Sequence, residues 1–160
     1  SVKVLIINDR SVEPETVAYF EEIQGRDDLD CRVIRPDPIS DDFNYARLIN
    51  EGVKHVKTPN FLQLNNDIEA REHGWLEDML GWLTVPGVAV VGAKLVYPNS
   101  KVQHAGAVIG PHGGLADHQF RDLLEDEVGY LAFPHAARNV SSVTGACMLT
   151  SIKFFVEIKL

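Results

Sequence analysis

The chain has 160 residues and a formal net charge of −8, with 45% hydrophobic and 24% charged residues. One domain of this size can bury a sizeable core, and the composition is that of a globular rather than a disordered protein. An acidic surface repels a polyphosphate backbone, which argues against nucleic-acid binding. No apolar stretch approaches the roughly 18 residues that a membrane-spanning helix needs. We therefore expect a soluble protein with no nucleic-acid partner and no transmembrane segment.

Neither the cysteines nor the clustered histidines match a disulfide or zinc pattern. Cys31 and Cys147 lie within core-like runs, so we expect buried, reduced thiols in a reducing compartment. His112 and His118 flank the glycine pair at 113–114, which suggests a mobile loop. Their spacing resembles no zinc signature, and a weak metal site is the most that it indicates.

The first part of the chain alternates short apolar runs with amphipathic patterns. The apolar runs predict buried strands, and the amphipathic patterns predict helices, the first beginning after a serine that precedes Pro14 and the second with candidate caps at 40–42. The expected strands cover residues 2–8, 30–37 and 60–67, and the expected helices cover 9–23, 40–56 and 72–87. Such regular alternation predicts a βαβ architecture with a mainly parallel sheet.

The second part of the chain is richer in β structure. Three β-type runs cover residues 88–98, 102–110 and 142–156, and a long polar connection covers 115–139. Turns containing glycine, proline or histidine separate these runs. Internal repeats, low-complexity stretches and clear linkers are not found. We therefore expect a single domain with an α/β front half and a β-rich back half.

Polar residues follow three successive expected strands, where ligands of parallel sheets bind. They are Asn8 and Asp9, then Asp37, and then Asn65, Asn66 and Asp67. Their positions predict that they converge on one crevice. Asp67 is the sharpest candidate, because one carboxylate between amide side chains can hold a divalent cation that takes its other ligands from water and phosphate.

Simpler structural roles remain open for each of these residues. The residues at 65–67 could have no role beyond forming a turn and capping the next helix, which is the more common role of such residues. Asp9 and Ser11 could accept hydrogen bonds from a nucleobase or ribose, or could cap the first helix. Asn44 and Asn50 lie in the second helix, and Asn50 could simply mark a helix end.

A histidine and two tryptophans also have both a functional and a structural interpretation. His104 lies between an expected strand and two small residues, where a structural hydrogen-bonding role is more common than a catalytic one. Trp75 and Trp82 are seven residues apart on one helical face, which favours core packing over a sugar-binding platform.

A phosphate-binding glycine-rich loop and a nucleophile elbow are both missing, which argues against ATP-driven phosphoryl transfer, nicotinamide chemistry and serine hydrolysis.

Five segments along the chain stand in a specific order. They read INDRSVEPET, FNYARLIN, FLQLNNDIEAREHGWLEDML, PGVAVVGAKLVYPNSKVQHAGAVIG and SSVTGACMLT. Together they resemble the family 2 glycosyltransferases, most of all the bacterial, rhamnosyltransferase-like branch that builds O-antigen and other surface polysaccharides. The resemblance covers nearly the whole chain. It implies an α/β fold of the GT-A type, a Rossmann-like nucleotide-diphospho-sugar transferase with a mostly parallel central sheet and helices on both faces.

The resemblance also implies a role for each polar strand end. Asp67 matches the last aspartate of the family's metal-binding motif, which holds Mn²⁺ or Mg²⁺ against the diphosphate of the sugar nucleotide. The residues implied on the nucleotide side are Asn8, Asp9, Ser11, Asp37, Asn44, Asn50, Asn65 and Asn66. His104, Gly145 and Ala146 are implied for the donor and acceptor pocket. Arg10 departs from the family pattern, which usually has glycine at that position.

The implied activity is transfer of a hexose-type sugar from a nucleoside diphosphate to a hydroxyl of a saccharide or lipid-linked saccharide acceptor, with inversion at the anomeric carbon. The metal would stabilise the departing diphosphate, and a carboxylate base would deprotonate the acceptor. The implied location is cytoplasmic, either free or peripheral at the inner face of the membrane. The implied domain is one GT-A domain over 1–160, with a nucleotide-binding half at about 1–92 and an acceptor-side half at about 93–160.

Two family segments have no counterpart in the sequence. The family's first strand is missing before Ser1, and the acidic segment with the catalytic base is missing after the 142–156 run, so the GT-A domain is expected to be truncated at both ends with its base beyond the C-terminus. Glu157 is not a candidate for that base. Either the chain is a piece of a longer enzyme, which we favour, or it is a natural short form that binds donor without turning it over.

Two competing functions come from other classes. A noncatalytic module could bind a nucleotide sugar or carbohydrate in the same crevice. A plain interaction domain could use the polar strand ends only as caps. Hydrolysis of sugar nucleotides with manganese would distinguish the enzyme from the noncatalytic module. Failure to bind any nucleoside diphosphate would support the interaction domain.

Overall fold

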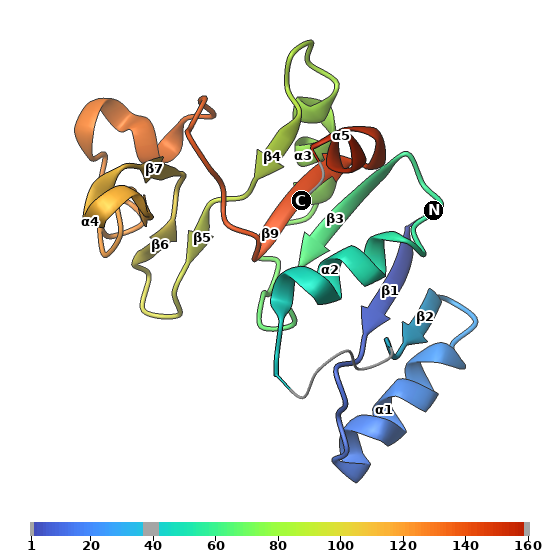
Figure 1. The fold of residues 1–160 in the computed structure, drawn as a ribbon. Helices are drawn as coiled ribbons and strands as arrows, with labels where there is room; N and C mark the ends of the chain where they lie inside the picture. The colour runs from blue at the N-terminus through green and yellow to red at the C-terminus, as the bar shows by residue number, and fades with distance from the viewer. Residues whose placement is uncertain (1, 37–41, 159–160) are drawn as a thin grey trace. The chain divides into compact units, whose positions relative to one another are not determined.

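The computed structural model describes residues 2–36 and 42–158, and its chain forms two compact units (Figure 1). Unit 1 comprises residues 1–59 and 156–160, and unit 2 comprises residues 60–155. Both units contain strands and helices, so the predicted α/β class is confirmed. Among the described residues no helix has both the length and the apolar character of a membrane span.

Unit 1 begins with a β-α-β arrangement followed by a second helix. Its elements are β1 (Lys3–Ile7), α1 (Pro14–Gln24), β2 (Asp30–Ile34) and α2 (Tyr45–Val53). β1 and β2 pair in parallel, with Lys3 opposite Asp30 and Ile7 opposite Ile34. This confirms the parallel pairing predicted for the first two strands.

The helix starts in unit 1 differ in part from the predicted ones. Glu13 is the N-cap residue of α1 and makes no side-chain cap, so Ser11 does not cap this helix. Pro14 occupies the first turn, where its missing N–H leaves no hydrogen bond unmade. Asn44 caps α2, because its side chain accepts a hydrogen bond from the Arg47 backbone N–H at 2.9 Å. Two of the candidate caps, Ser40 and Asp41, lie outside the described residues.

Unit 2 contains an antiparallel sheet in the strand order β3-β9-β4 (Figure 1). These strands are β3 (Asn60–Leu64), β9 (Cys147–Ser151) and β4 (Val90–Gly92), and β9 runs antiparallel to both neighbours. The predicted parallel character therefore holds for β1 and β2 but not for this sheet. The apolar pattern of a strand reports burial but not the direction of a partner far along the chain.

A compact apolar core fills one side of this sheet. Helix α3 (Trp75–Leu83) packs there, and the buried members of the core are Met79, Leu95, Cys147 and Leu149. Trp75 is partly buried against this cluster, as predicted, whereas Trp82 is 51% exposed, so the prediction of core packing is wrong for Trp82.

The last expected strand is shorter than predicted and is followed by a helix. β9 ends at Ser151, and α5 (Ile152–Glu157) begins directly after it. Ser151 explains the change, because its hydroxyl accepts a hydrogen bond from the Phe154 backbone N–H at 3.1 Å, as a helix cap does. Phe155 of α5 then stacks edge-to-face on Phe61 of β3, with ring centroids 5.2 Å apart.

Two small hairpins complete unit 2. β5 (Leu95–Val96) pairs antiparallel with β6 (Val102–His104), and β7 (Ala107–Ile109) pairs antiparallel with β8 (Ala116–His118). A short helix, α4 (Pro111–Gly114), joins β7 to β8, and a 3₁₀ helix, η1 (Tyr130–His135), follows in the long connection. Ala107 lies opposite His118 and also bridges to Ser142, so β7 connects this hairpin to the segment that precedes β9.

The two cysteines are free thiols with different surroundings. Cys147 is 2% exposed, as predicted, whereas Cys31 is only partly buried, which corrects the prediction for that residue. Burial raises the pKa of both thiols, so both favour the protonated form.

Gly52 allows α2 to approach β1 closely, and this generates a stability prediction. A Cβ atom at this position would overlap Cδ1 of Ile7 and lie 3.1 Å from its Cγ1, whereas a Cβ at Gly81 in α3 would have nothing within 4 Å. We expect Gly81→Ala to raise the free energy of unfolding by up to about 1 kcal/mol. We expect Gly52→Ala to lower it by about 1–3 kcal/mol, since the overlap must be relieved by movement.

Urea denaturation of the two alanine variants measures both effects. Ile7→Val removes the overlapping methyl group, so it should recover part of the loss when combined with Gly52→Ala. Equal stability of Gly52→Ala and Gly81→Ala would show that α2 does not depend on this contact.

Candidate functional site

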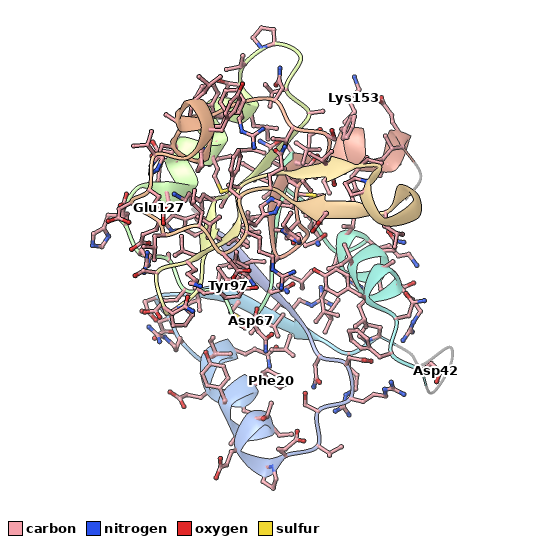
Figure 2. All side chains as sticks on the ribbon, turned by 90° about the vertical axis from the view of Figure 1, so that its left-hand side faces the viewer. Phe20, Asp42, Asp67, Tyr97, Glu127 and Lys153 are labelled. Carbon is pink, nitrogen blue, oxygen red and sulfur yellow. The ribbon has the colours of Figure 1, made fainter. Side chains whose placement is uncertain are left out.

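The turn after β3 presents the predicted metal-binding carboxylate to solvent. Asn65 is partly buried, whereas Asn66 and Asp67 are exposed, and Figure 2 labels Asp67 among the side chains. The backbone N–H of Asn65 donates to the carbonyl oxygen of Ala146 at 2.9 Å, which extends the β3–β9 pairing by one residue. Asp67 thus lies two residues beyond the point where β3 leaves the sheet.

The segment Thr144–Ala146 leads into β9 and is held beside β3. Gln63, which is 8% exposed, donates from Nε2 to the carbonyl oxygen of Gly145 at 2.8 Å. The Ala146 backbone N–H donates to Oγ1 of Thr144 at 3.3 Å. The structure therefore brings the predicted pocket residues Gly145 and Ala146 next to the turn that carries Asp67.

Sequence reasoning missed the part played by Gln63 and Thr144. Gln63 is an amide between two leucines of strand β3, and that signal was available in the sequence. A buried amide must find hydrogen-bond partners, so its presence in a core strand indicates a nearby polar backbone segment. Which segment supplies that partner depends on the tertiary pairing of β3 with β9.

A pair of histidines supports the same segment from the other side. Nδ1 of His104 lies 2.8 Å from Nδ1 of His118, and the two rings meet edge-to-face with centroids 4.9 Å apart. The Thr144 backbone N–H donates to Nε2 of His104 at 3.3 Å. His104 is 1% exposed, and burial, followed by the charge of His118, lowers its pKa to about 4. The His104 imidazole is therefore neutral at neutral pH.

His118 was predicted to flank a mobile glycine-containing loop and, with His112, to form at most a weak metal site. It lies instead on β8, where the β7–β8 pairing places it near β6. Sequence spacing gives no signal for this pair, because the two residues come from different hairpins.

Two of the predicted residues of unit 1, Asn8 and Asp9, directly follow the end of β1. Asn8 is 8% exposed, its backbone N–H donates to the carbonyl oxygen of Ile34 at 2.8 Å, and its Oδ1 accepts from the Ser11 backbone N–H at 2.8 Å. Asp9 lies beside Arg10, with Oδ1 to Nε at 3.4 Å. Arg10 has a φ of 65°, a left-handed conformation that favours glycine. That conformation fits the family pattern, which usually has glycine there.

An open cleft of about 300 Å³ lies in unit 1 at the carboxyl end of β2. Its lining residues are Arg32, Val33, Ile34, Arg35, Pro36, Glu51 and His55. Arg35 also donates to the carbonyl oxygen of Ser11 at 2.8 Å, which connects this strand end to the loop after β1. Asn50 is partly buried on α2 next to the lining residue Glu51, and Asp37 lies outside the described residues.

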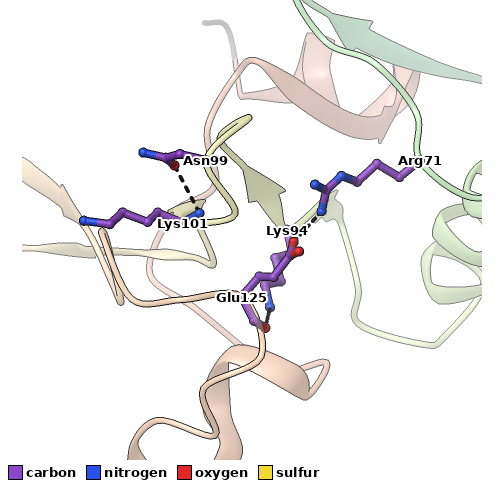
Figure 3. Close-up of polar contacts among 5 residues, drawn as sticks. All are labelled: Arg71, Lys94, Asn99, Lys101 and Glu125. Carbon is purple, nitrogen blue, oxygen red and sulfur yellow. Dashed lines mark hydrogen bonds and ion pairs between the residues drawn. The ribbon is translucent and has the colours of Figure 1, made fainter.

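A polar cluster connects three segments of unit 2 (Figure 3). The Glu125 carboxylate forms an ion pair with Arg71, and the Glu125 backbone carbonyl accepts from Nζ of Lys94 at 3.2 Å. The hydrogen bond from Arg71 lowers the pKa of the Glu125 carboxyl. Arg71 also lines a cleft of about 290 Å³ at the start of α3. The cluster thus holds the segment after Asp67 against the long connection.

The donor set around Asp67 fits an open cation site rather than a closed protein cage. Within the described ranges 2–36 and 42–158, no group of three histidine, cysteine or acidic side chains gathers as a ligand set. Mg²⁺ and Mn²⁺ need only one or two carboxylates, since water and substrate phosphate supply the rest. An exposed aspartate beside amide side chains meets that requirement.

Comparison with known proteins decides the family. Residues 1–148 match the family model described as glycosyl transferase family 2. The chain belongs to this family. It is 34% identical over 155 residues to the O-antigen biosynthesis protein RfbC of Myxococcus xanthus, and 35% identical over 153 residues to the uncharacterized protein y4gI of Sinorhizobium fredii. No solved structure matches the chain.

The relatives are much longer than this chain. The matched region covers 96% of the chain in both cases, but only 12% of the Myxococcus protein and 16% of the Sinorhizobium protein. The match therefore concerns one region of each relative.

The histidine pair generates a pH prediction. The pKa of His104 is about 4 in the fold and near 6.5 in an unfolded chain, so the unfolded state binds more protons between these values. We expect the free energy of unfolding to carry the full contribution of neutral His104 above pH 6.5. This contribution should fall by roughly 1–3 kcal/mol as pH drops to 4. Urea denaturation from pH 4 to 7 measures this change.

The matched variant for this measurement is His104→Gln. Glutamine removes the titrating group but keeps an acceptor for the Thr144 backbone N–H. Carboxyl groups titrate in both proteins, so the difference between the two pH profiles isolates His104. Parallel profiles would contradict the assignment of a neutral, buried imidazole.

Proposed function

We propose that the chain transfers a sugar from a nucleoside diphosphate donor to a hydroxyl group of a saccharide or lipid-linked saccharide, in the synthesis of a cell-surface polysaccharide. Membership of glycosyl transferase family 2 and the similarity to a protein named for O-antigen biosynthesis support this proposal. The observation that carries it is the exposed Asp67 at the end of β3, next to the backbone segment that contains Gly145 and Ala146.

The proposal gives Asp67 the role of metal ligand. Its carboxylate would hold Mn²⁺ or Mg²⁺, with Asn65 and Asn66 beside the ribose and phosphate. A divalent cation bound there would supply positive charge to the departing diphosphate. Gly145 and Ala146 would line the donor sugar pocket, where a backbone without large side chains allows close approach of a sugar ring.

Residues of unit 1 receive the nucleoside contacts in this proposal. Asn8, Asp9 and Ser11 lie at the carboxyl end of β1, where ligands of parallel strands bind. The Asn8 side chain already organises this turn through Ser11. Asn44 is the N-cap residue of α2, and Asn50 lies within this helix. Glu51 of α2 and His55, just beyond its end, line the cleft at the end of β2. Asp37, outside the described residues, belongs to the same proposed set.

The reaction follows from direct displacement at the anomeric carbon. The acceptor oxygen forms the new glycosidic bond as the bond to the diphosphate breaks, which inverts the configuration. The acceptor hydroxyl loses its proton to a carboxylate base. We further propose that the chain belongs to one domain of the GT-A fold, that it belongs to the rhamnosyltransferase-like branch of the family, and that it acts in the cytoplasm or at the inner face of the membrane.

Calorimetric titration with UDP, dTDP and GDP, each with and without manganese, tests the donor site. We expect one of them to bind in a manganese-dependent way. Asp67→Asn should weaken this binding at least about tenfold, because it removes the only charged ligand assigned to the cation. Unfolding stability should stay within about 0.5 kcal/mol of wild type, since the side chain is exposed.

Asp126→Asn is the matched control, because Asp126 is also an exposed aspartate of unit 2. It changes the net charge equally and should leave the affinity unchanged. Equal affinity of the Asp67 variant and wild type would remove Asp67 from the cation site. Manganese-dependent binding without any hydrolysis or transfer of the corresponding sugar nucleotide would favour a noncatalytic binding module.

A further inference from the structure

The contacts of His104 and His118 determine which nitrogen of each ring carries a proton. A backbone N–H can only donate, so Nε2 of His104, which meets the Thr144 N–H at 3.3 Å, must be an unprotonated acceptor. The neutral His104 ring then carries its proton on Nδ1. That N–H faces Nδ1 of His118 at 2.8 Å, so His118 accepts there and carries its own proton on Nε2.

The Thr144 N–H and His118 together favour this tautomer of His104. Without an acceptor at His118, the Nδ1–H of His104 would have no partner in its buried position, where an unmade hydrogen bond is costly. The opposite tautomer would place an N–H against the Thr144 N–H, two donors facing each other. The chain of hydrogen bonds thus runs in one direction, from the Thr144 N–H to His104 and from the His104 Nδ1–H to His118.

The hydrogen-bond chain starts at Thr144, in the segment that the proposed function assigns to the donor sugar. Four backbone groups of Thr144–Ala146 are fixed by named partners: the Thr144 N–H by His104, the Gly145 carbonyl by Gln63, the Ala146 N–H by the Thr144 hydroxyl, and the Ala146 carbonyl by Asn65. Gln63 and Asn65 come from β3 and its end, on the side of Asp67. His104 comes from β6, and its hydrogen bond to Thr144 ties the segment to the first hairpin.

We propose that His104 and His118 are positioning residues for sugar-nucleotide binding, which hold Thr144, Gly145 and Ala146 in place through a single-tautomer hydrogen-bond chain. This inference rests on the proposed function, since it concerns the same donor pocket. Neither histidine touches substrate in it: His104 is 1% exposed, and it acts through the Thr144 N–H.

Asparagine and glutamine substitutions of His104 separate the two hydrogen bonds of this ring. In His104→Gln the side-chain oxygen lies near the former Nε2 and keeps the acceptor for Thr144. In His104→Asn the shorter side chain places its polar group near the former Nδ1 and loses that acceptor. We expect His104→Asn to weaken manganese-dependent nucleotide-sugar binding about tenfold, and His104→Gln to keep the affinity within about threefold of wild type.

Val102→Ala is the control for destabilisation alone. Val102 is a fully buried residue of the same strand, β6, and its truncation removes packing without removing a hydrogen-bonding side chain. It should lower the free energy of unfolding while leaving the affinity of the folded protein unchanged. Urea denaturation identifies conditions in which all variants are folded before titration.

A second pair of variants tests His118 by ¹⁵N NMR of the imidazole rings. In wild type we expect His104 to be protonated on Nδ1 and His118 on Nε2. His118→Asn keeps an acceptor and should leave the His104 tautomer unchanged. His118→Phe removes the acceptor and leaves the buried His104 Nδ1–H without its partner, so the ring is held less firmly against Thr144. We expect a loss of nucleotide-sugar affinity similar to that of His104→Asn.

The outcomes separate the inference from the function on which it rests. If wild type binds no sugar nucleotide, the proposed function fails, while the tautomers can still be measured. If wild type binds and His104→Asn binds equally well, the positioning role is overturned. An Nε2-protonated His104 in the wild-type protein would overturn it as well.

Discussion

The pairing of β9 with β3 is the constraint on which the candidate site depends. It joins residues more than 80 positions apart, such as Leu64 and Cys147, and so carries the segment 144–146 to the turn that contains Asp67. Backbone hydrogen bonds fix the register, and a shift by one residue would move every side chain of β9 to the opposite face. The buried side chains of Cys147 and Leu149, packed under α3, hold this register from one face.

Two buried polar side chains of unit 2 are directed toward this junction. Gln63 and His104 are each less than a tenth exposed, and each uses its side chain to fix a backbone group of the segment before β9. A polar group without a partner in such a position costs free energy, so these contacts limit the conformations that the segment can adopt. A pocket built from glycine and alanine has little side-chain structure of its own, and its shape is set by such backbone contacts.

The chain is acidic and its proposed donor is an anion, so binding requires positive charge close to the diphosphate. The net charge of −8 repels a nucleoside diphosphate at long range. A divalent cation at Asp67 would provide positive charge at the diphosphate. Within unit 1, two arginines and Glu51 line the cleft at the end of β2.

The sequence by itself determined the α/β class, the parallel β1–β2 pair, the exposed polar turn after β3 and the family. It determined these because apolar runs, turn residues and segment order are local properties of the chain. Only the tertiary structure decided that β9 runs antiparallel between β3 and β4, that α5 replaces the end of an expected strand, and that Trp82 is exposed. It also decided that Gln63, His104 and His118 support Thr144–Ala146. These contacts join residues from strands and hairpins far apart in the chain, and local patterns specify neither a strand's partner nor its direction.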